Sequence, residues 1–198
     1  MDNSKVVVNK ENQKLKQILA TAQDLFFRYG IRRVTVEEIC RTAGVSKMTF
    51  YKYFKNKIDL VKKLMEKIYD QAMAEYRQIM DKPIPYVQKI EETIQWKLEQ
   101  QKNISQEFIK DYLSSDNEEL LRFFHQKRDE MLKEILDDYS KAQEEGDIRQ
   151  DLKPEFILYL LNKLTEFYQD ESLLKMYGSP RELTKEVLNF FFYGILVR

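Results

Sequence analysis

The apolar positions along most of the chain recur with the spacing of one-sided helices. Between residues 15 and 29 they fall at steps of three and one, and Gly30 follows where a glycine commonly ends a helix. Similar stripes predict further helices at about 35–43, 47–53, 56–80, 86–102, 105–113, 117–146, 154–169 and 180–196. We expect residues 1–9 to form a loose tail. The pattern predicts an all-α fold of about nine helices.

Two of the predicted helices are short and follow a longer one. Thr35 with Glu38 three residues later forms a capping box, Gly44 ends this helix, and Ser46 is a good N-cap for the next. Two short helices joined by a glycine-containing turn are the sequence form of a helix-turn-helix, whose second helix enters the DNA major groove.

The second short helix has one apolar side and one polar side. Phe50 and Phe54 are four residues apart and are expected to pack inward with Val45. The side chains left for the outside are Lys47, Met48, Thr49, Tyr51, Lys52 and Tyr53. Lysine reaches phosphate or guanine, and hydroxyl groups bond phosphate oxygens. A small three-helix bundle with a solvated basic face remains the alternative.

Two further residues lie at helix N-termini, where free backbone N–H groups favour a phosphate. These are Thr35 and Lys57. The charge distribution supports the same reading, because residues 1–60 carry 12 Lys and Arg against 6 Asp and Glu, whereas residues 61–198 carry 21 against 27. A basic N-terminal segment followed by an acidic remainder is typical of a nucleic-acid-binding segment joined to a domain that does not bind nucleic acid.

Composition argues against most other classes of protein. One cysteine and one histidine cannot make a disulfide or a cysteine zinc cage, and no phosphate loop or nucleophile elbow is present. We therefore expect no enzyme activity, no metal and no cofactor. The longest apolar run has eight residues, Phe190 to Val197, too few to cross a bilayer. The expected location is the cytoplasm, with no membrane partner.

The stretch from Phe26 to Leu60 closely resembles the N-terminal domain of TetR-family regulators. The resemblance rests on several runs together, which are YG (29–30), TVEEI (35–39), AGVS (43–46), FYKYF (50–54) and NKIDL (56–60). It covers about residues 12–72 and implies a helix-turn-helix at 35–54, followed by a helical ligand-binding and dimerisation domain at 73–198. The resemblance implies DNA contacts from Thr35, Ser46, Lys47, Thr49, Tyr51, Lys52, Tyr53 and Lys57.

Met48 departs from the family pattern, which often has glycine at this position. A methionine there offers an apolar contact, for instance to a thymine methyl group, so it bears on which DNA sequence is read.

The helices predicted at about 154–170 and 180–197 are apolar almost all round, which favours burial against a partner. We expect them to form a homodimer interface, as the TetR resemblance also implies. A dimer can place two recognition helices about 34–36 Å apart on a near-palindromic site in double-stranded DNA.

The body of the chain is rich in aromatic residues, which suit a flat or apolar small-molecule effector. The candidate ligand contacts are Trp96, Phe108, Tyr112, Phe124, His125, Tyr159 and Phe167. Such residues also serve as ordinary core. The sequence therefore predicts a dimeric DNA-binding transcriptional regulator, a repressor released by a small apolar or aromatic effector. The alternative is a DNA-bound scaffold that recruits a protein partner and senses no small molecule.

Overall fold

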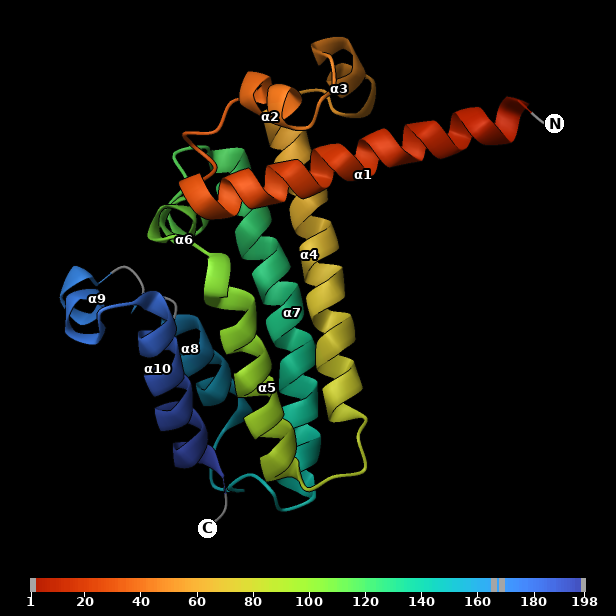
Figure 1. Cartoon of the computed structure of the whole chain (residues 1–198). Coiled ribbons are helices and arrows are strands. Elements are labelled where there is room, and N and C mark those ends of the chain that lie inside the picture. Colours follow the sequence, from red (N-terminus) through yellow and green to blue (C-terminus); the bar gives the residue numbers. More distant parts are fainter. Residues whose placement is uncertain (1–2, 165–166, 168–169, 197–198) are drawn as a thin grey trace. The chain divides into compact units, whose positions relative to one another are not determined.

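The computed structural model describes residues 3–164, 167 and 170–196 (Figure 1). The α-helices are α1 (Asn3–Tyr29), α2 (Val36–Thr42), α3 (Lys47–Tyr53), α4 (Lys57–Met80), α5 (Tyr86–Gln100), α6 (Gln106–Leu113), α7 (Glu118–Glu144), α8 (Pro154–Leu164), α9 (Glu171–Tyr177) and α10 (Pro180–Ile195). A 3₁₀ turn, η1 (Gln101–Asn103), follows α5. The described residues form no strand beyond one isolated bridge, between Ile148 and Leu196. The predicted all-α fold is confirmed.

One helix start and one whole helix differ from the predictions. Helix α1 starts at Asn3, so the predicted tail was wrong over residues 3–9; residues 1–2 lie outside the described part. The apolar stripe that suggested a start near residue 15 marks only the packed part of this helix. The end predicted near residue 169 for the eighth helix also lies outside the described residues, as do 165–166, 168 and 197.

Helix α9 was not predicted because it has no apolar stripe. None of its seven residues is buried, so no periodic pattern marks it. Local bonds at its ends define it instead: the Asp170 carboxylate accepts hydrogen bonds from the backbone N–H groups of Ser172 and Leu173, and Gly178 ends the helix with a φ of 71°.

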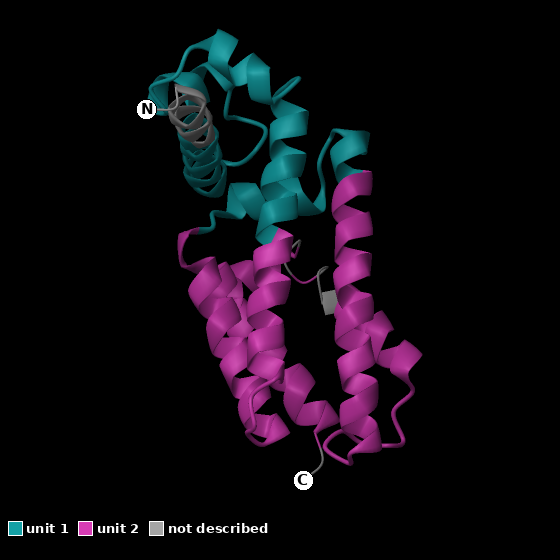
Figure 2. Ribbon diagram, turned by 90° about the vertical axis from the view of Figure 1, so that its right-hand side faces the viewer, with its two compact units in different colours: residues 1–68, 104–121 teal, residues 69–103, 122–198 magenta. Residues whose placement is uncertain are grey.

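The chain folds into two compact units (Figure 2). Unit 1 consists of residues 1–68 and 104–121, and unit 2 consists of residues 69–103 and 122–198. The sequence predicted one boundary near residue 72. The structure instead returns the chain to unit 1 for residues 104–121, which carry α6 and the start of α7.

Unit 1 has a continuous apolar core contributed by α1, α2, α3 and α4. Its almost fully buried side chains are Ile18, Ala22, Phe26, Val34, Ile39, Phe50, Phe54, Leu60, Val61 and Leu64. Helix α6 packs on α1 through Phe108, whose ring centroid is 4.8 Å from that of Phe27. The backbone N–H of Ser105 also donates to the Phe27 carbonyl over 2.8 Å. Burial of this apolar surface is the main contribution to the stability of the unit.

Gly30 allows α6 to approach the end of α1 closely. Its φ of 83° is a left-handed conformation that a side chain disfavours. A Cβ atom at this position would lie 2.7 Å from the Asp111 Oδ2 atom and 3.2 Å from the Glu107 Cβ atom, both on α6. The glycine therefore serves both the turn and the packing.

Unit 2 is a helical bundle with a second apolar core. Its buried side chains are Tyr76, Tyr86, Ile90, Ile94, Leu98, Ile135, Tyr139, Ala142, Ile148, Ile157, Leu188, Phe191, Phe192 and Ile195. An ion pair between Arg77 and Glu134 joins α4 to α7 on the surface of this unit. None of the helices in the described part of the chain has the length and apolar character to span a lipid bilayer.

Candidate nucleic-acid interface

Helices α2 and α3 are joined by a tight turn whose backbone is internally bonded. The Val45 N–H donates to the Cys40 carbonyl over 3.0 Å, the Gly44 N–H donates to the Arg41 carbonyl, and Gly44 has a φ of 64°. This is a Schellman-type helix end. The Thr35 and Ser46 hydroxyls each accept a backbone N–H three residues on, from Glu38 and Thr49, over 3.1 Å. Both predicted caps are confirmed, and they fix where the two helices begin.

One side of α3 is anchored in the core and the other faces outward. Phe50 is fully buried, and its ring lies 5.3 Å from that of Phe54. On the outer side, Met48 is 74% exposed and Tyr51 is 57% exposed. With seven residues, α3 is about two turns long. The diameter of an α-helix with its side chains, about 10–12 Å, matches a major groove about 12 Å wide.

The remaining predicted DNA contacts divide by exposure. Thr35, Ser46, Lys47 and Lys52 are exposed, whereas Thr49, Tyr53 and Lys57 are partly buried. The Ser46 and Thr49 hydroxyls bond each other over 3.0 Å, and the Lys47 ammonium lies 3.3 Å from a Glu37 carboxylate oxygen on α2. Side chains of these types can exchange such solvent-exposed partners for phosphate oxygens or base edges.

The Lys57 ammonium is occupied within the protein. It donates to the carbonyl oxygens of Ile31 at 2.9 Å, Arg32 at 3.2 Å and Val34 at 2.9 Å. An ammonium has three N–H donors, so all three are used on the loop between α1 and α2. Burial lowers the pKa of Lys57, and the nearby Asp111 carboxylate partly opposes this shift. In this arrangement Lys57 positions the loop, and a phosphate contact would require it to release a carbonyl.

Lys63 holds the other end of the recognition helix, a role that the sequence did not suggest. Its ammonium donates to the Tyr53 carbonyl over 3.1 Å and lies 5.3 Å from the centre of the Phe54 ring. Asp59 supports the same corner, because its carboxylate accepts the Lys55 N–H over 2.9 Å and lies 3.5 Å from the Lys63 ammonium. Lysine near a helix C-terminus also balances the helix dipole.

Residues 104–121 attach to the loop before α2 and to α4 through charged groups. The Asp111 carboxylate accepts the backbone N–H of Arg32 over 2.8 Å, and the Arg32 guanidinium pairs with Asp116. Farther along, Lys62 on α4 pairs with Glu119 on α7 over 2.7 Å. These bonds help to hold α6 and the start of α7 in unit 1, which also contains α2 and α3.

The candidate ligand contacts are divided between the two units. Phe108 and Tyr112 belong to α6 of unit 1, where their rings stack. The other five belong to unit 2: Phe124 is buried, Trp96 is partly buried, and His125, Tyr159 and Phe167 are exposed. Each contact remains a prediction, but these residues do not share one described pocket.

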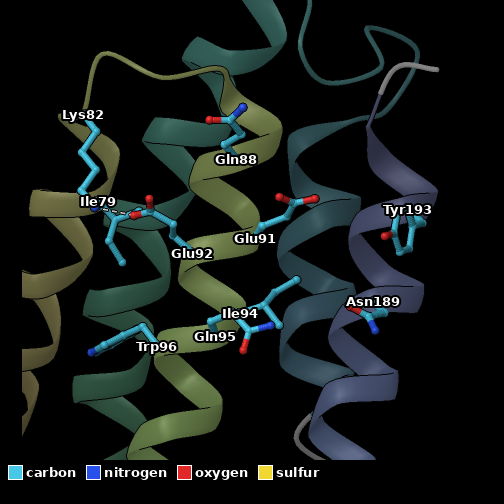
Figure 3. A pocket seen from close by; sticks show the side chains of 10 residues that line it. All are labelled: Ile79, Lys82, Gln88, Glu91, Glu92, Ile94, Gln95, Trp96, Asn189 and Tyr193. Carbon is cyan, nitrogen blue, oxygen red and sulfur yellow. Dashed lines mark hydrogen bonds and ion pairs between the residues drawn. The ribbon is translucent and has the colours of Figure 1, made fainter.

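Trp96 does line a surface pocket of about 780 Å³ in unit 2 (Figure 3). Its walls come from the end of α4, from α5 and from α10, where Asn189 and Tyr193 lie. The Trp96 indole N–H donates to the Glu75 carboxylate, and Lys82 pairs with Glu92 across one side. In the described residues, no three His, Cys, Asp or Glu side chains are grouped so that they could hold a metal ion.

Comparison with known proteins places this geometry among bacterial regulators. Residues 18–64 match the profile of the family described as "Bacterial regulatory proteins, tetR family". The HTH-type transcriptional repressor KstR2 of Mycobacterium tuberculosis is 31% identical over 75 residues, which are 38% of this chain and 38% of KstR2. The match thus spans well under half the length of this curated relative.

Solved structures match nearly the whole chain. Reduced NemR from E. coli superposes with a TM-score of 0.74 at 18% identity, covering 94% of this chain and 98% of NemR. The regulator FadR from Bacillus subtilis, in complex with stearoyl-CoA, superposes with a TM-score of 0.72 at 19% identity, covering 91% of this chain and 99% of FadR. At these identities the likeness establishes the fold.

Proposed function

The chain belongs to the TetR family of bacterial regulatory proteins, and on this basis we propose that it is a transcriptional repressor that binds a near-palindromic operator as a homodimer. The observation that carries the proposal is the recognition helix α3. Phe50 anchors its inner side, Ser46 caps its start and Lys63 binds its end, so its outer side is rigid and exposed. A rigid polar helix presented this way suits base-edge contacts in a major groove.

The exposed side chains of α3 fall into two groups, according to whether they would contact phosphate oxygens or base edges. Lys52, Tyr51 and Tyr53 would bind phosphate oxygens, which fixes position without reading sequence. Lys47, Met48 and Thr49, near the start of the helix, would contact base edges, because the N-terminal residues of a recognition helix meet the bases. Lys47 would exchange its exposed partner Glu37 for DNA.

The proposed dimer interface consists of the outward sides of α8 and α10. Large aromatic side chains stand exposed there: Phe190 at 85%, Tyr193 at 70%, Tyr159 at 57% and Phe156 at 50%. The opposite sides of these helices pack into the core of unit 2 through Ile157 and Phe191. Exposed aromatic groups on neighbouring helices favour a self-complementary contact with a second copy.

We further propose that a small-molecule effector binds unit 2 and releases the DNA. The similar regulator FadR from B. subtilis forms a complex with stearoyl-CoA, which supports a small-molecule ligand for this chain as well. Helix α4 continues from unit 1 into unit 2, so a ligand that binds one position of this helix better than another would shift the population of DNA-competent dimers.

Selection of bound duplexes from a random DNA pool tests the proposed function. The wild-type protein should enrich an inverted repeat, and Lys52→Met should lower affinity for all duplexes. Lys175→Met is the matched control, since it removes an exposed lysine from α9 in unit 2. Failure of the wild-type protein to enrich any sequence would contradict the proposal.

A further inference from the structure

The loop between α7 and α8 is bonded to the C-terminal end of α10. The backbone N–H of Arg149 donates to the Ile195 carbonyl over 3.0 Å, and the Arg149 guanidinium donates to the Gly194 carbonyl over 3.1 Å. Ile148 and Leu196 form an antiparallel bridge beside these bonds. The loop and the C-terminal end of α10 therefore lie together at one end of unit 2 (Figure 1).

Arg149 supplies hydrogen-bond donors that α10 lacks. The last carbonyls of an α-helix have no N–H partner within the helix, and α10 ends at Ile195. Arg149 bonds the last two carbonyls of α10, and its positive charge lies at the negative end of the helix dipole. A residue from another segment therefore caps α10 and ties the end of this helix to the loop.

Two side chains hold Arg149 and its loop in place. The Asp151 carboxylate accepts hydrogen bonds from the Arg149 Nε and Nη2 atoms over 3.1 and 2.7 Å. These bonds raise the pKa of Arg149 and lower the pKa of Asp151. The Gln143 amide on α7 donates to the Arg149 and Leu152 carbonyls, each over 2.7 Å. The loop is thus bonded to α7 on one side and to α10 on the other.

These bonds lie next to both helices of the proposed dimer interface. Helix α8 begins five residues after Arg149, and α10 ends at Ile195, whose carbonyl Arg149 bonds. Two of the exposed aromatic side chains are close to this point in the chain: Phe156 in the first turn of α8 and Tyr193 in the last turn of α10. Arg149 therefore helps to determine how the end of α10 lies relative to the start of α8.

A contact between two identical copies depends on the relative position of its side chains. In an isologous interface the same surface is used twice, so a displaced helix end disturbs the contact in two places. Side chains that are already held in the binding arrangement also lose less conformational freedom on association. Release of the end of α10 would therefore weaken the dimer, although no side chain that contacts the second copy has changed.

We propose that Arg149 is a positioning residue of the dimer interface, which holds Tyr193 and Phe156 in the arrangement that a second copy contacts. This inference rests on the proposed homodimer and specifies what fixes the geometry of its interface. The Arg149 guanidinium bonds Gly194 and Asp151 of its own chain, so it acts through the end of α10 and not through a bond to the second copy.

The dissociation constant of the dimer, measured by sedimentation of the full chain over a dilution series, tests this role. Arg149→Met removes the guanidinium but keeps an unbranched side chain, and it should raise the dissociation constant about tenfold or more. Arg149→Lys keeps a charged donor for the Gly194 carbonyl and should raise the constant less. Arg77→Met is the matched control, because it removes a guanidinium that joins α4 to α7 in the same unit, and it should leave the constant unchanged.

A double-mutant cycle separates positioning from a general loss of stability. Because Arg149 acts through the position of Tyr193, Arg149→Met should change the dissociation constant less in a Tyr193→Ala protein than in the wild type. A role confined to folding would lower the urea midpoint of Arg149→Met and leave its dissociation constant at the wild-type value. That result, or additive effects in the cycle, would overturn the proposal.

Asp151→Asn carries the test if circular dichroism shows that Arg149→Met does not fold. It removes the charge that orients the guanidinium and leaves Arg149 in place, so it should also raise the dissociation constant; an unchanged constant would then overturn the proposal. A wild-type dimer whose constant is the same in all these variants contradicts only this inference. A wild-type protein that is monomeric at every concentration contradicts the proposed homodimer, and this inference with it.

Discussion

The Lys57 ammonium donates a hydrogen bond to the Ile31 carbonyl over 2.9 Å, across 26 residues of sequence. With its bonds to Arg32 and Val34, it ties the start of α4 to the loop that leads into α2. A lysine at this position looks like a phosphate contact when only the sequence is considered. The structure gives it three internal acceptors, and this difference leads to a first prediction.

Lys57→Met should lower the free energy of unfolding and leave the salt dependence of DNA affinity unchanged. Three carbonyls lose their donor, and two of these bonds are part-buried; leaving buried acceptors unsatisfied costs about 1–3 kcal/mol, so we expect a loss toward the lower end of that range. Urea denaturation measures the loss. The salt dependence of DNA affinity should keep its wild-type slope, whereas Lys52→Met should reduce that slope by about one. A Lys57→Met protein with wild-type stability and a flatter salt dependence would show that Lys57 binds phosphate instead.

Gly30→Ala should destabilise unit 1 through two separate effects. The φ of 83° disfavours any side chain, and the new Cβ would clash with Asp111 Oδ2 at 2.7 Å. Gly44→Ala is the control, because its φ is 64° but no atom lies within 4 Å of the new Cβ. We expect about 1 kcal/mol of destabilisation for the strained φ alone and more for Gly30→Ala. Equal losses in thermal denaturation would rule out the steric contribution from α6.

Thr49→Ala and Met48→Ala should change which DNA sequence is preferred. Both residues lie in the first turn of α3, where a recognition helix meets base edges. Each direct base contact contributes about 1–3 kcal/mol of discrimination, so the preference at one or two positions of each half-site should relax. Deep sequencing of selected duplexes measures this. Identical selected sites for wild type and both variants would exclude these residues as base readers.

Phe190→Glu should convert the protein into a monomer. This side chain is 85% exposed in the single chain, so the substitution leaves the core of unit 2 intact and affects only a contact with a second copy. Analytical ultracentrifugation should show half the wild-type mass, with unchanged helical content by circular dichroism. Lys185→Glu, an exposed change on the same helix, is the control. A dimeric Phe190→Glu protein would place the interface elsewhere.

Local spacing was enough to predict the helix-turn-helix but not the bonds that hold it. The caps at Thr35 and Ser46 depend on residues three positions away, so the sequence displays them directly. Lys63 bonds a carbonyl 10 residues away, and Asp111 bonds a backbone N–H 79 residues away. No periodic pattern encodes those distances.

The candidate ligand residues illustrate a second limit. Aromatic side chains at helical spacing indicate that a helix packs against other parts of the protein. They do not indicate which of the two units the helix belongs to. Phe108 and Tyr112 pack in unit 1 because residues 104–121 return to it, a connection that the sequence does not reveal.

Dimethyl sulfate footprinting on the selected operator tests the central claim most directly, because this reagent methylates guanine N7 in the major groove. Two recognition helices of a dimer should protect guanines in two half-sites centred about 34–36 Å apart, and Thr49→Ala should leave the spacing unchanged. Full reactivity of these guanines under saturating protein would contradict the claim that α3 enters the major groove.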